Sequence, residues 1–178
     1  KIVDALKTDS NPQGKFLHPV TKQRQHLCIT GGEPLMITGQ SATVGIYEEL
    51  ERQDNLPLSM TFESNGTQKL KQPFIDWVNR IDTEIFFSIS PKLWSVAGEK
   101  AEKAIKPEIV KEYHDLSRTG QLKFVCGHKD EQWDEMEQAI QKFKDAGGKV
   151  SQIPTQTRKS AGIQERIPSA AEKKQLRA

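Results

Sequence analysis

The stretch HLCITGGEP at residues 26–34 decides the fold of this chain. Residues 26–30 form a short run that predicts a β-strand, and two glycines and Pro34 follow closely. Consecutive glycines let the backbone approach a ligand and leave its N–H and C=O groups accessible, whereas proline stiffens the exit from the turn. Because a helix is expected next, over residues 41–53, this stretch predicts the start of a strand–helix–strand unit.

The same alternation of strand and helix continues along the chain. Further strands are expected at 58–62, 85–89, 122–126 and 150–153, and further helices over 70–80, from Pro107 and from Asp130. Parallel neighbours need a crossover between them, so this order predicts a parallel sheet in an α/β fold. A partial (β/α) barrel and a doubly wound sheet both satisfy the pattern.

Three of the expected helices have a recognisable apolar face. Asp130 is expected to cap its helix, Gly120 to follow the helix from Pro107, and Gly147 with Gly148 to end the last of the three. The expected core positions on these helices are Ala42, Ile46 and Leu50, then Val110, Tyr113 and Leu116, and then Trp133, Met136, Ile140 and Phe143.

Composition bounds the class of protein. The 178 residues are 28% charged and 35% hydrophobic, which is typical of one globular domain with a well-solvated surface. A net charge of +2 argues neither for nor against a nucleic-acid partner. No apolar run is long enough for a transmembrane helix and no signal peptide opens the chain, so we expect a cytoplasmic protein without a membrane partner.

The ends of the sequence indicate part of a longer protein. The first residue is Lys1, and Ala178 falls inside a helix that a capping box at 169–172 is expected to open. We expect one partial domain with a polar, loop-like lead-in at 1–24, a core at 25–154 and a C-terminal segment at 155–178. The two cysteines, Cys28 and Cys126, are expected to be buried small hydrophobes, because two thiols alone do not make a metal site.

Polar residues follow the strands, at the edge where parallel α/β folds place their chemistry. Glu63 and Asn65 follow the second expected strand, Ser90 and Lys92 follow the third, and Lys123 lies within the fourth. Together they predict a rim that suits a ligand with an amino group, a carboxylate and sugar hydroxyls. Each motif alone is also an ordinary turn, and Lys123 also suits an edge strand that discourages aggregation.

The ordered set of motifs resembles a known family. TGGEP at 30–34 resembles the Gly-Gly-Glu-Pro motif of radical S-adenosylmethionine enzymes. ESNGT at 63–67, SPK at 90–92 and QLKFV at 121–125 are similar to the run found in 7-carboxy-7-deazaguanine synthases. The resemblance covers residues 25–154 and implies a partial (β/α) barrel of the radical S-adenosylmethionine type, truncated at both ends.

The resemblance also implies a reaction and its participants. The family is a carbon–nitrogen lyase that converts 6-carboxy-5,6,7,8-tetrahydropterin to 7-carboxy-7-deazaguanine, with loss of ammonia, on the route to queuosine in transfer RNA. Its cofactors are S-adenosyl-L-methionine, a 4Fe–4S iron–sulfur cluster and Mg²⁺. Its partners are the pterin substrate, an electron donor such as flavodoxin and a second copy in a homodimer, with no direct nucleic-acid contact.

Site residues are implied in the same way. The glycine pair and Glu33 would hold the methionine amino group, and Ser90 and Lys92 would face its carboxylate. Lys123 and Gly31 would contact the substrate. The residues implied for S-adenosylmethionine are Gly31, Gly32, Glu33, Glu63, Asn65, Ser90 and Lys92.

The sequence departs from the family upstream of the glycines. The three-cysteine cluster motif belongs before this strand, and no cysteine precedes Cys28. The magnesium-contacting threonine belongs beside that motif, so neither a metal ligand nor a catalytic residue is expected within these residues, which should be inactive alone. Two alternatives stay open: another small radical enzyme, such as a glycyl-radical activase, and a cluster-less αβ-barrel binding module.

Overall fold

The computed structural model describes residues 2–7, 13–18, 20–117, 119–127 and 129–148. Four parallel strands form one sheet there: β1 (Leu27–Ile29), β2 (Ser59–Ser64), β3 (Glu84–Ile89) and β4 (Thr119–Leu122). The prediction of an α/β fold with a parallel sheet is therefore confirmed. The strand expected at 150–153 and the capping box at 169–172 lie outside the described residues.

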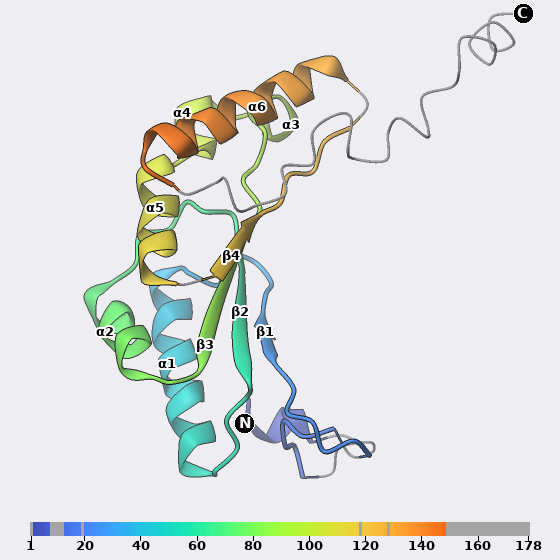
Figure 1. Ribbon diagram of the computed structural model, residues 1–178, viewed down its shortest axis with the longest axis vertical. Coiled ribbons are helices and arrows are strands. Elements are labelled where there is room, and N and C mark those ends of the chain that lie inside the picture. The colour runs from blue at the N-terminus through green and yellow to red at the C-terminus, as the bar shows by residue number, and fades with distance from the viewer. Residues whose placement is uncertain (1, 8–12, 19, 118, 128, 149–178) are drawn as a thin grey trace, which may run out of the picture.

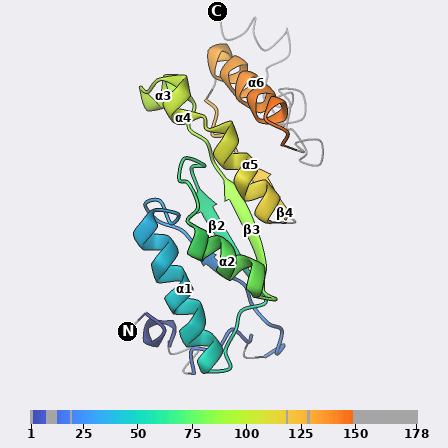
Figure 2. The ribbon, with the colours of Figure 1, turned by 90° about the vertical axis from the view of Figure 1, so that its left-hand side faces the viewer.

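The strands lie side by side in the order in which they occur along the chain. Crossovers between parallel strands are right-handed, so adding every new strand on the same side places the intervening helices on one face. Figures 1 and 2 show α1 (Ile37–Arg52), α2 (Gln72–Arg80) and α5 (Pro107–Leu116) together on that face. The described sheet is thus wound in one direction, unlike a doubly wound sheet, whose strand order reverses and whose two faces are both covered.

The remaining helices lie toward the carboxyl ends of the strands. The chain after β3 forms two short helices, α3 (Trp94–Ala97) and α4 (Ala101–Ala104), before α5 begins. The long helix α6 (Asp130–Asp145) packs against α5 and α3, at the top of Figure 1. Proline stands in the first turn of both α2 and α5, where its fixed φ favours the helix and its missing N–H costs nothing.

The core lies between the sheet and its helices. Alternate residues of β2 and β3, such as Met60 and Phe87, are buried there. Aromatic rings then join the layers, because Phe87 stacks on Tyr113 of α5 with ring centroids 5.0 Å apart. Rings arranged in this way each add about 0.5–1.5 kcal/mol beyond the burial of their area. The other aromatic pairs of this core are Phe62–Phe74, Phe62–Phe87, Phe74–Trp77 and Tyr47–Trp77.

Strand β4 differs from its prediction in both bounds. We expected residues 122–126 and the structure has Thr119–Leu122, so Gly120 lies in the strand and does not follow a helix end. A Cβ at Gly120 would lie 3.0 Å from the carbonyl oxygen of Phe87, which shows that glycine permits the close approach of β4 to β3. Lys123 lies just beyond the strand, although its N–H still donates to the carbonyl of Ile89 at 2.7 Å.

Several smaller expectations need correction. The inward face of α1 carries Gln40, Thr43, Tyr47 and Leu50, whereas Ala42 is exposed. Leu58 precedes β2 and is 57% exposed, because the strand begins one residue later. Asp130 is the first residue of α6 and Lys129 takes the capping position, where no side chain bonds to the helix. The face of α6 is as predicted, with Trp133, Met136, Ile140 and Phe143 buried.

The lead-in is more ordered than a polar loop. Asp4–Leu6 forms a 3-10 turn, and Leu17 pairs with Arg24 in an antiparallel bridge. The buried side chain of Asn55 accepts a hydrogen bond from the N–H of Phe16 at 3.0 Å and donates to the carbonyl of Gly14 at 2.9 Å. One amide thus fastens the lead-in to the loop between α1 and β2. Among the described residues, no helix has the length and apolar character needed to cross a membrane.

Candidate functional site

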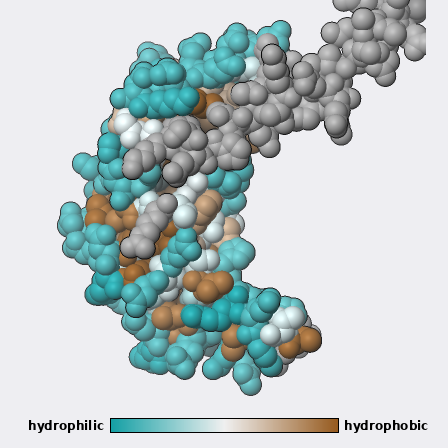
Figure 3. Space-filling view, in the orientation of Figure 1, coloured by the Kyte–Doolittle hydropathy of each residue, from teal (hydrophilic) through white to brown (hydrophobic). Residues whose placement is uncertain are grey.

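The face of the sheet opposite the helices carries polar side chains in rows. Neighbours in a parallel register point to the same side, and Glu63 of β2 pairs with Ser88 of β3, which pairs with Gln121 of β4. This row lies near the carboxyl ends of the strands, where parallel α/β folds place their sites. Figure 3 shows the molecule as a crescent whose hollow lies on the side of this open face.

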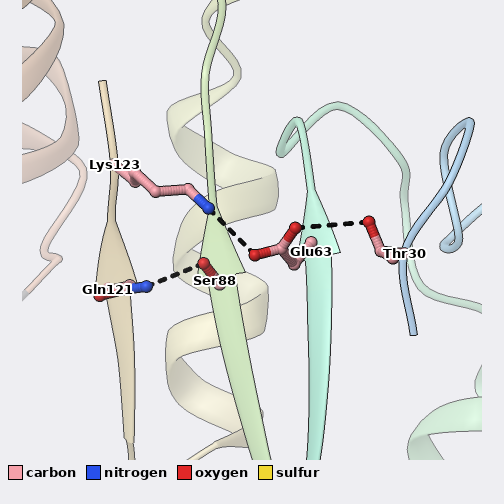
Figure 4. A network of polar contacts seen from close by, with 5 residues as sticks. All are labelled: Thr30, Glu63, Ser88, Gln121 and Lys123. Carbon is pink, nitrogen blue, oxygen red and sulfur yellow. Dashed lines mark hydrogen bonds and ion pairs between the residues drawn. The ribbon is translucent and has the colours of Figure 1, made fainter. Parts of the chain in front are cut away.

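Side chains at the ends of the four strands form two hydrogen-bonded groups, which lie next to each other (Figure 4). Lys123 Nζ lies 3.0 Å from Glu63 Oε1, and Thr30 Oγ1 donates to Glu63 Oε2 at 3.3 Å. Gln121 Nε2 donates to Ser88 Oγ at 2.9 Å. The ion pair therefore reaches from the end of β2 to the end of β4, over the short side chain of Ser88.

The electrostatics of this row follow from Lys123. Its hydrogen bond and its charge hold the pKa of Glu63 below the ordinary range, and the hydrogen bond from Thr30 adds to the effect. The side chains of Lys123 and Glu63 are 46% and 41% exposed, so water screens the pair and it stabilises the fold little. Because this ion pair is weak, it can open, and the Lys123 ammonium and the Glu63 carboxylate can then each bind a group of a ligand.

The glycine turn, residues 30–34, places its backbone on the same rim. Gly31 and Gly32 have φ values of +91° and +53°, and both are exposed. Among the described residues, nothing else lies within 4 Å of a Cβ built at either position, so backbone conformation is what requires glycine there. Their N–H and C=O groups are accessible to a ligand on the rim.

The Glu33 carboxylate joins the glycine turn to the end of β2. Its Oε1 accepts from the N–H of Leu35 at 3.1 Å and from Ser64 Oγ at 2.8 Å, and its Oε2 accepts from the N–H of Asn65 at 2.8 Å. These three donors use most of the acceptor capacity of the carboxylate, so its main role is structural. We therefore interpret Glu33 as the brace of the turn.

The other predicted residues are brought together unequally. The Asn65 side chain accepts from the N–H and the hydroxyl of Thr67, so it shapes its own turn. Ser90 lies beside the end of β2, with its N–H 2.7 Å from the carbonyl oxygen of Ser64. Lys92 is exposed and has no hydrogen bond or ion pair within the described part of the chain.

The described residues do not suit a metal centre. Within them no group of three or more His, Cys, Asp or Glu side chains could hold a metal ion. Cys28 on β1 is exposed and Cys126 after β4 is half-buried, so the expectation of two buried cysteines is wrong. The two lie at opposite edges of the sheet. Loss of solvation is still the main cause that raises the pKa of both thiols, so the thiolate that binds iron is disfavoured. These residues therefore fit neither a 4Fe–4S cluster nor a Mg²⁺ ion.

Sequence reasoning missed Gln40, a buried residue near the rim, and it placed Tyr113 in the core without its polar contact. Gln40 of α1 is 2% exposed and hydrogen-bonds to the loops after β1 and β2. Tyr113 of α5 donates to the carbonyl of Gln68, and burial raises the pKa of its hydroxyl well above the ordinary value. Both occupy helical core positions, where a polar group signals a specific partner.

A cavity of about 440 Å³ lies at the other end of the sheet. It lies near the amino ends of the strands, and its walls include Arg24, Tyr47, Arg80 and Thr83. None of the predicted site residues lines it, so the cavity and the rim are separate features. We place the candidate site at the rim, because that is where polar groups from all four strands meet.

The rim combines an exposed glycine backbone, an exchangeable ion pair and a bracing carboxylate. Such an arrangement can bind a polar ligand that carries both an amino group and an acid. Comparison with known proteins found no matching family model, no matching curated protein and no matching solved structure.

Proposed function

We propose that this chain supplies the S-adenosylmethionine-binding rim of a radical enzyme of the 7-carboxy-7-deazaguanine synthase type. The observation that carries the proposal is the Lys123–Glu63 pair, which stands beside Thr30 and the glycine turn. Four motifs that the sequence places far apart thus meet at one edge of the sheet. Their order and residue types are those of the family that the sequence resembles.

Each group on the rim has a chemical part in holding this cofactor. The main chain of Gly31 and Gly32 would accept and donate hydrogen bonds at the methionine amino group. Ser90 and Lys92 would meet the carboxylate, for which an exposed cation and a hydroxyl are suitable partners. Glu63 would accept hydrogen bonds from ribose hydroxyls once Lys123 turns toward the substrate carboxylate.

The described residues supply binding and orientation, and they do not supply ligands for a cluster or for magnesium. We therefore assign no catalytic step to them. The proposal requires that three cluster cysteines be encoded elsewhere in the complete reading frame. The reaction proposed for the whole protein is the ring contraction of 6-carboxy-5,6,7,8-tetrahydropterin with loss of ammonia, and its product would enter transfer RNA modification.

The first experiment is anaerobic iron–sulfur reconstitution of the protein expressed from the complete reading frame. We expect absorbance near roughly 400 nm that bleaches with dithionite, as for a cluster held by cysteine thiolates. The reconstituted protein should then cleave S-adenosylmethionine and consume the carboxypterin. Cleavage of S-adenosylmethionine without consumption of the pterin would refute the proposed family but would still support a radical S-adenosylmethionine enzyme.

The rim is tested by calorimetric titration of S-adenosylmethionine into matched variants. Glu63→Gln removes the carboxylate at the rim, and Glu84→Gln removes an exposed carboxylate at the opposite end of the neighbouring strand, on the same face. We expect Glu63→Gln to weaken binding and Glu84→Gln to leave it unchanged. Equal affinities for both variants would refute the placement of the cofactor.

A binding module without a cluster is the second candidate, and the lack of metal-ligand groups among the described residues favours it. A protein from the complete reading frame that binds S-adenosylmethionine but forms no cluster would establish that reading and overturn the enzymatic proposal.

A further inference from the structure

Gln40 uses its whole amide to connect the two loops that form the candidate rim. Its Nε2 donates to the carbonyl of Leu35 at 2.6 Å and to that of Lys69 at 3.1 Å. Its Oε1 accepts from the N–H of Lys71 at 2.8 Å. Leu35 directly follows the glycine turn, and Lys69 and Lys71 belong to the loop between β2 and α2.

The first turn of α1 is shaped for this contact. A Cβ at Gly39 would lie only 2.2 Å from the carbonyl oxygen of Pro34, so the glycine turn rests against the helix where only glycine fits. Gln40 is the next residue and is 2% exposed. A buried amide whose donors and acceptor are all used holds its partners in one geometry, because losing any of these bonds leaves a buried group unpaired.

The glycine turn needs restraint from outside. Gly31 and Gly32 have positive φ, and no atom of the described part of the chain outside the turn would contact a Cβ at either position, so packing within that part does not fix them. Besides the bond from Thr30 to Glu63, two polar bridges hold the segment that contains them. Glu33 joins it to Ser64 and Asn65, and Gln40 joins its far end to residues 69 and 71.

We propose that Gln40 is a positioning residue that sets the affinity of the rim for S-adenosylmethionine without touching it. This inference rests on the proposed function. Ordering the glycine turn before the ligand arrives removes part of the entropic cost of binding. Gln40 also links the loop after β2 to that turn, so a ligand bound at Gly31 and Gly32 should reduce the opening of the bond at Lys71.

The test compares three variants of the complete protein. Gln40→Met keeps the length of the side chain and removes all three hydrogen bonds, and Gln40→Glu keeps the acceptor alone. Thr43→Val is the matched control, because Thr43 is equally buried on the same face of α1 and has no bond to either loop. For each variant, calorimetry gives the dissociation constant for S-adenosylmethionine, and urea unfolding gives the stability.

We expect Gln40→Met to bind S-adenosylmethionine about tenfold more weakly than the wild type, equivalent to about 1.4 kcal/mol. Gln40→Glu should weaken binding at least as much, because it places a carboxylate against two carbonyls. Thr43→Val should leave affinity unchanged even where stability falls. If Gln40→Met folds and binds as tightly as Thr43→Val, Gln40 has only a structural role and the inference is wrong.

Hydrogen exchange on the wild type is a second test that needs no variant. Adding S-adenosylmethionine should slow exchange at the amide of Lys71 together with the amides of residues 31–33 and Leu35. Protection that ends at residue 36 would overturn the coupling through Gln40. If the wild type binds no S-adenosylmethionine in any assay, the proposed function is wrong. Hydrogen exchange at Lys71 then tests the contact of Gln40 with the two loops by itself, and it should be faster in Gln40→Met than in the wild type.

Discussion

Substituting Gly66 with alanine should be among the most damaging single-methyl changes near the rim. Gly66 follows the end of β2 with φ at +77°, a conformation that costs an L-residue about 1–2 kcal/mol. The new Cβ would lie 2.8 Å from Ile89 Cγ2 and 3.0 Å from Val110 Cγ2, and both neighbours are buried in the core. Relieving that overlap costs about 1–3 kcal/mol.

Alanine also lowers the conformational entropy of the unfolded chain, which raises the free energy of unfolding by about 0.4–1 kcal/mol. We therefore expect Gly66→Ala to lower the free energy of unfolding by about 2–4 kcal/mol, judged from these ranges. For a chain of this size that corresponds to a fall in Tm of roughly 2–4 °C per kcal/mol. Urea unfolding followed by circular dichroism measures the free energy directly.

Gly98→Ala is the matched control. Gly98 ends α3 with φ at +66°, and no other residue that the structure describes comes within 4 Å of a Cβ built there. It should therefore show the conformational cost alone, about 1 kcal/mol. If Gly66→Ala is no more destabilising than Gly98→Ala, the close packing of Gly66 between β3 and α5 adds nothing to the loss of stability, and the reasoning is refuted.

Three further predictions concern polar groups described above. Lys123→Met should raise the pKa of Glu63 toward its ordinary value, because the bond and charge that lower it are lost. In the wild type, the stability from this pair is present above the ordinary carboxyl pKa and disappears as pH falls through the lowered one. Carboxyl-carbon NMR titration reads both proteins, and identical curves would contradict the assignment. The thiol of Cys28 should react with a disulfide reagent at pH 8 more slowly than free cysteine, because burial and the charge of Glu63 raise its pKa. Glu63→Gln should speed the reaction, and an unchanged rate would show that the carboxylate has no effect. Asn55→Ala should cost about 1–3 kcal/mol in urea unfolding, because the N–H of Phe16 loses its buried acceptor. A loss within error of zero would show that water replaces the amide.

The strands predicted best from the sequence are those in which the apolar residues are also the residues paired with a neighbouring strand. β3 was expected over 85–89 and spans Glu84–Ile89, because its alternate residues Ile85, Phe87 and Ile89 form the floor of the core. β4 was misplaced because its pairing with β3 begins at Thr119 and passes through Gly120, a residue type that is depleted in strands. Long-range register decided that strand, and local composition does not encode register.

The sequence predicted that polar residues at the strand ends form the rim. The role of each residue there could be assigned only from its contacts in the folded structure. Sequence position placed Glu33 in a ligand-binding motif, whereas its carboxylate bonds to residues about thirty positions away. Gln40 was not singled out, because the helix was expected to begin at residue 41 and its partners at 69 and 71 are equally distant along the chain. Such contacts carry no local periodicity, so only the folded chain reveals them.

The sequential strand order also determines how a fold of this kind can change its size. Each strand of the described sheet hydrogen-bonds only to the strands immediately before and after it in the chain. A further strand–helix unit, gained by duplication or fusion, could therefore join beside β1 or β4, the outer strands of the described sheet, without rerouting any connection between these strands. The architecture is modular in the sense of a repeat array, in which length can vary while each unit keeps its neighbours.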